Sequence, residues 1–121
     1  LRVAFGAEGG RSALAQLHER GSGATAVFAA NGVLAEGAWR EIAARRIRIP
    51  LELSFVAFDD APWMSMVVPG ITAVRQPSRE LGAAAVDALL RRQEHPDDIR
   101  RTIRLGTTLV ERGSVAPPRT D

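Results

Sequence analysis

Cysteine, lysine and tyrosine are all absent from this 121-residue sequence. Without cysteine there is no disulfide framework, no cysteine-ligated zinc and no thiolate chemistry. The only histidines are His18 and His95, and two isolated histidines cannot form a metal cluster, so we interpret both as solvated residues. We therefore expect neither a metal site nor a bound cofactor.

The basic residues are all arginine, sixteen in number, and fourteen acidic residues oppose them, which leaves a formal net charge of only +2. Because no lysine or tyrosine titrates in the alkaline range, the isoelectric point is high although the chain is not strongly basic at neutral pH. The pairs Arg45-Arg46, Arg91-Arg92 and Arg100-Arg101 are scattered among acidic residues. This distribution favours solvated helix faces over a phosphate-binding stripe, so we do not expect the chain itself to contact DNA.

No apolar run approaches the roughly 20 residues that a membrane span needs, so no membrane contact is expected. Residues 1–5 also lack the charged region and apolar stretch of an export signal. However, Leu1 is not a starting methionine and the sequence opens directly on a strand-like run, so we expect that an amino-terminal portion precedes it. With 45% hydrophobic residues, the chain has the size and apolar content of one globular domain.

Strand-like and helix-like segments alternate along the sequence and are joined by short connections. Strands are expected over residues 1–5, 24–30, 53–58, 71–74 and 102–110, and helices over about 6–20, 33–46 and 78–92, the last capped by Gln76-Pro77-Ser78. This order predicts an α/β fold, an open parallel sheet flanked by helices. Ligands of such sheets bind at the carboxyl ends of the strands, where Asn31 and Asp59 are the polar residues.

Two short motifs resemble parts of catalytic sites, but neither has the accompanying residues that catalysis needs. Gly6 to Gly10 follows a strand, but it lacks both the Walker lysine and the spacing of a dinucleotide loop, so it is interpreted as a tight strand-to-helix turn. Asp59 and Asp60 are adjacent at a strand end and should diverge, so at most one of them faces a pocket. No serine, histidine and acid combination accompanies them, so no catalytic residue is assigned. A single carboxylate can still bind a polyhydroxylated ligand, because it accepts two hydroxyl hydrogens at once.

Ordered sequence blocks resemble the LacI/GalR family of transcriptional regulators over nearly the whole chain. The blocks are Ala26–Asn31, Ala35-x-Gly37-Ala38, Ile49-Pro50, Ser54–Asp60, Ile71–Pro77, Leu81-Gly82-x-x-Ala85 and Leu109–Ser114. One departure is Gly32, which stands where the family usually has aspartate after the asparagine. This departure puts the capping of the following helix in doubt, but not a ligand contact from Asn31.

The resemblance implies a type I periplasmic-binding-protein-like subdomain, truncated in this sequence. Residues 1–74 and 102–114 would form the carboxy-terminal subdomain, and residues 75–95 would form a crossover helix that belongs to the other subdomain. The DNA-binding domain, the amino-terminal subdomain, and the first strand and helix of the carboxy-terminal subdomain would all be absent.

The resemblance also implies roles for individual residues. Phe5 would stack on the effector, Asn31 and Asp59 would hydrogen-bond it, and Gln76 would lie near the cleft at the subdomain crossover. Phe5 could instead be core, and Asp59 could be a structural cap. The family's dimer surface corresponds to Glu36, Trp39, Arg40, Met66, Val67 and Val68. Trp39 could equally be buried core, and Trp63 and the methionines could fold back as a satellite core.

The function that the resemblance implies is effector sensing in a dimeric, cytoplasmic DNA-binding repressor. A small molecule, a sugar or related metabolite, would alter operator affinity allosterically, and DNA would be contacted only through the missing amino-terminal domain. A periplasmic sugar-binding protein of a transport system and a doubly wound enzyme are the alternatives. The blocks Ile71–Pro77 and Leu109–Ser114 favour the regulator. The identity of the effector, and its action as inducer or corepressor, stay open.

Overall fold

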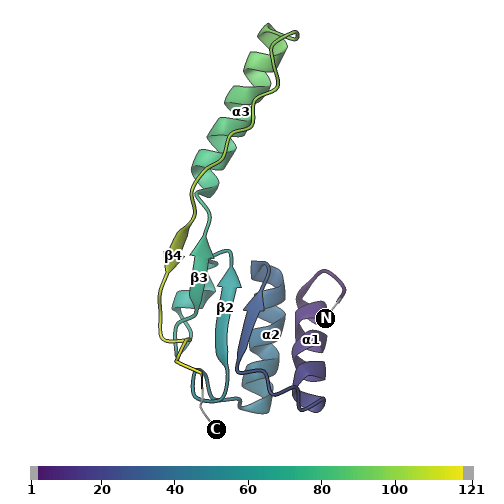
Figure 1. Cartoon of the computed structure of the whole chain (residues 1–121), viewed down its shortest axis with the longest axis vertical. Helices are drawn as coiled ribbons and strands as arrows, with labels where there is room; N and C mark the ends of the chain where they lie inside the picture. The colour runs from purple at the N-terminus through teal and green to yellow at the C-terminus, as the bar shows by residue number, and fades with distance from the viewer. Residues whose placement is uncertain (1–2, 119–121) are drawn as a thin grey trace. The chain divides into compact units, whose positions relative to one another are not determined.

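The computed structural model describes residues 3–118, which separate into two compact units. The first unit ends at Arg75 and resumes at Leu109, and the second comprises Gln76–Thr108. The elements in chain order are helix α1 (Ala7–Glu19), strand β1 (Ala26–Ala29), helix α2 (Gly32–Arg45), strand β2 (Ser54–Phe58), the 3-10 helix η1 (Pro62–Ser65), strand β3 (Thr72–Arg75), helix α3 (Ser78–Glu94) and strand β4 (Thr108–Val110) (Figure 1). Among the described residues, no helix is long and apolar enough to cross a membrane.

The sheet has the order β1-β2-β3-β4, and the predicted open α/β sheet is confirmed. β1 pairs with β2 and β2 with β3, both in parallel, with Phe28 opposite Val56 and Phe58 opposite Val74. β4 completes a mixed sheet beside β3. The parallel strands end at one edge of the sheet, and the polar candidate residues follow there.

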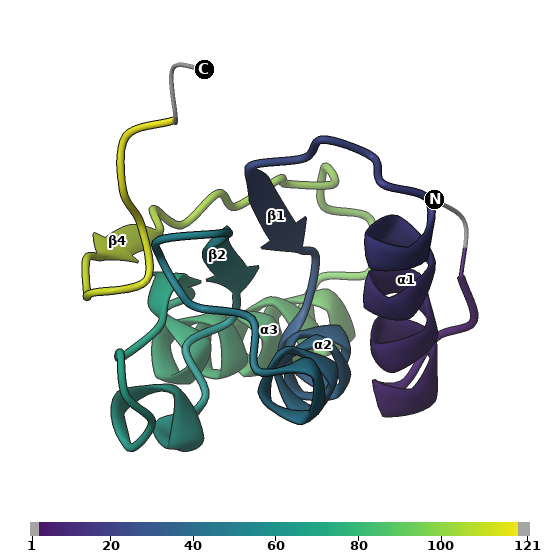
Figure 2. The ribbon, with the colours of Figure 1, turned by 90° about the horizontal axis from the view of Figure 1, so that it is seen from below.

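Helix α2 packs on β1 and β2, and α1 packs beside α2 (Figure 2). Two glycines allow this close approach of the helices. A Cβ atom on Gly10 would lie 2.1 Å from the carbonyl oxygen of Leu34, and one on Gly37 would lie 1.7 Å from that of Ala7. Gly10, in the first turn of α1, is therefore needed for helix packing, which supports the interpretation of this motif as structural.

The core lies between the sheet and the helices, with Phe55, Met64 and Ile71 fully buried. The ring of Trp39 on α2 lies 6.1 Å from that of Phe55, centroid to centroid. Because aromatic pairs at this separation add to the energy of apolar burial, Trp39 helps to fix α2 on β2.

A buried carboxylate joins α1 to α2. Glu41 accepts a hydrogen bond from Arg11 of α1 at 2.9 Å and one from Arg45 at 2.6 Å, and Arg45 also reaches Glu19 at 2.8 Å. The hydrogen bonds from Arg45 and Arg11 lower the pKa of Glu41. The carboxylate is thus ionised at neutral pH and fully paired, as a buried charge must be.

Two predicted strands are wrong in whole or in part. Residues 3–5 form no strand, and residues 1 and 2 of that prediction lie outside the described residues. Of the strand predicted over residues 102–110, only Thr108–Val110 is formed. Apolar and β-branched residues can favour extended backbone, but a strand also needs a partner for its amide and carbonyl groups.

The second unit contains α3, and no side chain of this helix is buried. Its apolar residues Leu81, Val86, Leu89 and Leu90 are all exposed. The helix begins within the predicted cap segment Gln76-Pro77-Ser78, with Pro77 at the cap position, but no side chain there bonds the first amides of the helix. The first amides of α3 thus have no side-chain acceptor at the cap.

Candidate functional site

The edge formed by the carboxyl ends of β1 and β2 brings Asn31-Gly32 beside Asp59. A Cβ atom on Gly32 would lie 3.6 Å from the Cβ of Asp59. The backbone amide of Asp59 in turn donates to the carbonyl oxygen of Val74 on β3 at 3.0 Å. The ends of three neighbouring strands therefore meet where a ligand of a parallel sheet is expected.

Asn31 is the N-cap residue of α2. Its Oδ1 accepts hydrogen bonds from the backbone amides of Val33 at 3.0 Å and Leu34 at 2.8 Å. The doubt about capping that Gly32 raised was unfounded, because asparagine supplies the cap from the preceding position. Since the oxygen is used by the helix, the Nδ2 amide group is the part of this side chain that can donate to a ligand.

Asp59 directly follows β2 and is partly exposed. Its φ of 73° places it in the left-handed region, which aspartate adopts more readily than most non-glycine residues. The chain therefore turns sharply at this residue. As a consequence, Asp59 and Asp60 lie in different surroundings although they are adjacent.

Asp60 is the buried member of the pair, and its side chain is only 4% exposed. Arg112 donates from Nη1 to Oδ1 at 2.7 Å and from Nη2 to Oδ2 at 3.0 Å, and Arg75 donates from Nε to Oδ2 at 3.0 Å. The bonds from Arg112, followed by those from Arg75, lower the pKa of Asp60. Asp60 was not among the predicted site residues. No group of three or more metal-ligating side chains occurs in the part of the chain that the structure describes.

Phe5 is 82% exposed, so the alternative that it packs in the core is wrong. It lies two residues before α1, whose first turn packs on the first turns of α2 through Gly10 and Leu34. This contact places Phe5 at the end of the helix layer where Asn31 begins α2. Gln76 directly follows β3 and is the first residue of the second unit.

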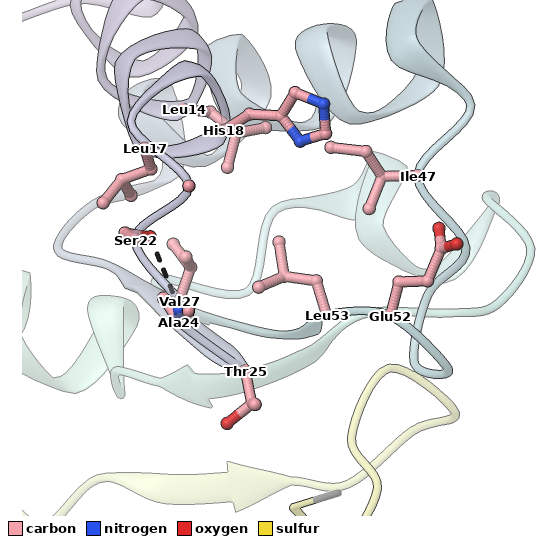
Figure 3. A pocket seen from close by; sticks show the side chains of 12 residues that line it. Leu14, Leu17, His18, Ser22, Ala24, Thr25, Val27, Ile47, Glu52 and Leu53 are labelled. Carbon is pink, nitrogen blue, oxygen red and sulfur yellow. Dashed lines mark hydrogen bonds between the residues drawn. The ribbon is translucent and has the colours of Figure 1, made fainter. Parts of the chain in front are cut away.

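A cavity of about 460 Å³ lies away from this edge (Figure 3). Its lining includes Leu14 and Leu17 of α1, Val27 of β1, and Ile47 and Leu53 of the connection between α2 and β2. His18 at its rim and His95 elsewhere are exposed, as predicted. Because half of the lining residues are aliphatic and none of the polar ones is buried, we do not assign the ligand site to this cavity.

The predicted dimer residues divide between surface and core. Glu36 and Arg40 form an exposed ion pair on α2, and Met66 and Val68 are 76% and 94% exposed. Trp39 and Val67 are partly buried against the core, and Met64 and Trp63 also fold back onto it. Met64 and Trp63 thus follow the satellite-core alternative, Met66 and Val68 are exposed, and the dimer interface stays a prediction.

An open α/β sheet with polar groups gathered at the carboxyl ends of its strands is the architecture of a small-molecule-binding domain. A sequence profile of the periplasmic binding protein-like domain matches residues 3–115. The chain belongs to this family, in the form found in the effector-binding domains of LacI/GalR-type regulators.

Two relatives illustrate the match. The ribose operon repressor of Haemophilus influenzae is 36% identical over 111 residues, which cover 92% of this chain and 33% of that protein. The HTH-type transcriptional regulator GalS of Salmonella typhimurium is 38% identical over 109 residues, which cover 90% of this chain and 32% of that protein. The chain thus spans about a third of the length of these relatives.

Solved structures agree with this assignment. A LacI family transcriptional regulator from Enterococcus faecium with bound ribose has a TM-score of 0.87 and 32% identity, over 98% of this chain and 44% of that one. A dimeric Lac repressor with a C-terminal deletion has a TM-score of 0.82 and 29% identity, over 96% and 42% of the two chains. These relatives are transcriptional regulators and not enzymes.

Proposed function

We propose that this chain senses a sugar effector for a cytoplasmic, DNA-binding repressor, as part of a longer protein. The observation that carries the proposal is the meeting of Asn31 and Asp59 at the carboxyl ends of β1 and β2. Each residue has its backbone or side chain fixed by hydrogen bonds to a neighbouring element. A site built on such fixed elements is preorganised for a small ligand.

The chemistry of these groups suits a polyhydroxylated ligand. The Asp59 carboxylate can accept from two hydroxyl groups, and the Asn31 Nδ2 amide can donate to a ring or hydroxyl oxygen. The exposed ring of Phe5 offers an apolar surface for the C–H face of a sugar, and Gln76 follows the next strand of the edge. Neither a catalytic group nor a cofactor is required for this role, so the protein is not an enzyme in this proposal.

Ribose is the first effector to test. Ribose operon repressors occur among the relatives, and two of the solved LacI-family structures contain bound ribose. Operator DNA is bound in one Lac repressor dimer structure. We propose that DNA contact here lies outside residues 1–121, and that residues 75–95 belong structurally to the second subdomain of the complete sensor.

The protein is also proposed to act as a homodimer. Glu36 and Arg40 on α2 form an exposed ion pair, and Met66 and Val68 on the loop after η1 are exposed apolar side chains. Trp39 and Val67, beside them in the sequence, are partly buried against the core. A twofold contact would cover the apolar side chains of both copies at once.

The experiment uses the full-length protein and a panel of pentoses and hexoses in a thermal-shift assay, followed by operator binding with and without each stabilising sugar. We expect ribose or a close relative to raise the melting temperature and to change operator affinity. A sugar that binds without any DNA binding by the protein would favour the transport alternative. Absence of both responses would contradict the proposal, and conversion of a bound ligand to product would point to an enzyme.

A further inference from the structure

The buried carboxylate of Asp60 is not used by the proposed sugar contacts. It accepts two bonds from the Arg112 guanidinium, one on each oxygen, and further bonds from Arg75. Arg112 is itself largely buried. A bidentate arginine–carboxylate pair of this kind is directional and rigid, unlike an exposed ion pair.

The two arginines lie close to the two points at which the chain passes between the first and second units. Arg75 is the last residue of β3, and the second unit begins at the next residue, Gln76. Arg112 comes shortly after the chain has returned to the first unit at Leu109. One carboxylate therefore holds both the outgoing and the returning segment.

Arg112 is also fixed to the segment before β3. Its Nη1 donates to the carbonyl oxygen of Ile71 at 2.6 Å. Its backbone amide donates to the Thr72 hydroxyl at 3.0 Å, and that hydroxyl donates to the Arg112 carbonyl oxygen at 3.2 Å. Because Arg112 is held at several points, it is a firm anchor for Asp60.

Asp60 is joined by one peptide bond to Asp59, the carboxylate proposed to bind the effector. The backbone of Asp59 has its φ in the left-handed region and bonds to Val74. The orientation of Asp59 is thus set on one side by β3 and on the other by the anchored Asp60. A displaced Asp60 would turn the Asp59 carboxylate away from the direction that the fold gives it.

We propose that Asp60, with Arg75 and Arg112, is a positioning latch that orients Asp59 and links it to both connections of the second unit. The proposal rests on the proposed function. When a sugar binds Asp59, it shifts the equilibrium between alternative conformations of the two segments that connect the units. The latch couples sugar binding to this equilibrium. The coupling requires that the sugar bind the two arrangements with different affinity.

The test compares Asp60→Asn and Arg75→Gln in the full-length protein, with ribose as the probe. Arg48→Gln is the matched control, since Arg48 forms an exposed ion pair with Glu52 outside the site. Calorimetry measures ribose affinity at a temperature at which every variant is folded. Fluorescence anisotropy measures operator affinity with and without ribose, and hydrogen exchange measures the backbone amides of Asp59 and Arg112.

We expect Asp60→Asn to weaken ribose binding at least tenfold, to reduce the ribose-induced change in operator affinity, and to speed exchange at both amides. Because Arg112 still bonds both oxygens of Asp60 in Arg75→Gln, this variant should lose less ribose affinity than Asp60→Asn, but it should lose part of the operator response. Arg48→Gln should match the wild type in all three measurements. A mere structural role would lower the melting temperature without changing affinity or response, and this result would overturn the proposal.

Two further outcomes are distinguishable. If Asp60→Asn does not fold, Arg75→Gln decides, and an unchanged operator response in that variant overturns the latch. If the wild type binds no ribose and no other sugar, the proposed function fails, but hydrogen exchange still tests the anchoring of Asp59. Unchanged exchange in Asp60→Asn would then refute the latch independently.

Discussion

We expect the hydroxyl of Ser114 to contribute strongly to the free energy of unfolding. The residue is 0% exposed. Its Oγ donates to the carbonyl oxygen of Phe55 on β2 at 2.6 Å and accepts from the amide of Thr72 on β3 at 2.8 Å. Its carbonyl oxygen accepts from the amide of Phe55 at 2.9 Å. Ser114 thus bridges β2 and β3 where they are not yet directly paired.

Ser114→Ala would remove the hydroxyl and keep the backbone bond. The Phe55 carbonyl and the Thr72 amide would each lose a buried partner, and an unsatisfied buried group costs about 1–3 kcal/mol. Because the carbonyl retains a second lone pair that can be bonded elsewhere, we expect a total in the lower half of the combined range, about 2–4 kcal/mol.

Urea denaturation followed by tryptophan fluorescence measures the effect, since Trp39 packs on Phe55. With a denaturant slope of about 2 kcal/mol per molar urea, in the usual range for small proteins, the midpoint should fall by roughly 1–2 M. Ser65→Ala is the control, because Ser65 is exposed and its hydroxyl donates only to the Pro62 carbonyl oxygen at 2.8 Å. Equal midpoints for the two variants would refute the assignment of Ser114 as a core bridge.

Three further results are expected. Gly37→Ala should destabilise the first unit by several kcal/mol, since its Cβ would meet a carbonyl oxygen of α1 at 1.7 Å. Gly82→Ala has open space around it and should stabilise α3 by about 0.5–1 kcal/mol. Equal urea midpoints for the two variants would contradict the packing argument. The pKa of Asp60 is lowered in the folded state, so its contribution to stability is present above the unfolded pKa of about 3.9 and is lost as the pH falls through the folded value. Stability measured against pH should therefore decline less on acidification in Asp60→Asn, and an identical decline would rule out this linkage. Met66→Asp combined with Val68→Asp should convert a dimer of the full-length protein to a monomer in light scattering without unfolding it, and an unaltered mass would count against the proposed surface.

Local patterns predicted the helices and the inner strands well. The helix predicted over residues 33–46 is observed at Gly32–Arg45, because its apolar spacing and its flanking residues are all local signals. The predicted strand over residues 1–5 is not formed at residues 3–5, and the one predicted over residues 102–110 is formed only at Thr108–Val110, because pairing depends on segments distant in the sequence. Asparagine before a helix is a recognised cap signal, so the role of the Asn31 oxygen could have been anticipated.

The different roles of Asp59, proposed to bind the ligand, and Asp60, buried and paired with arginine, could not be predicted from the sequence. The two residues are chemically identical and adjacent. A positive φ at Asp59 and two arginines, 15 and 52 residues from Asp60, distinguish them. Such long-range partners leave no local pattern, so the contacts that hold Asp60 could not be predicted, while the ligand-binding roles of Asn31 and Asp59 stay predictions.

Calorimetric titration of ribose into the full-length protein and its Asp59→Ala variant tests most directly whether this edge of the sheet binds the effector. Loss of a hydrogen bond to a charged group costs about 1.5–3 kcal/mol, so we predict that Asp59→Ala weakens ribose binding roughly 10- to 150-fold. The fold should be intact, with the same circular dichroism spectrum as the wild type. Ribose binding of equal affinity in the two proteins would contradict the account.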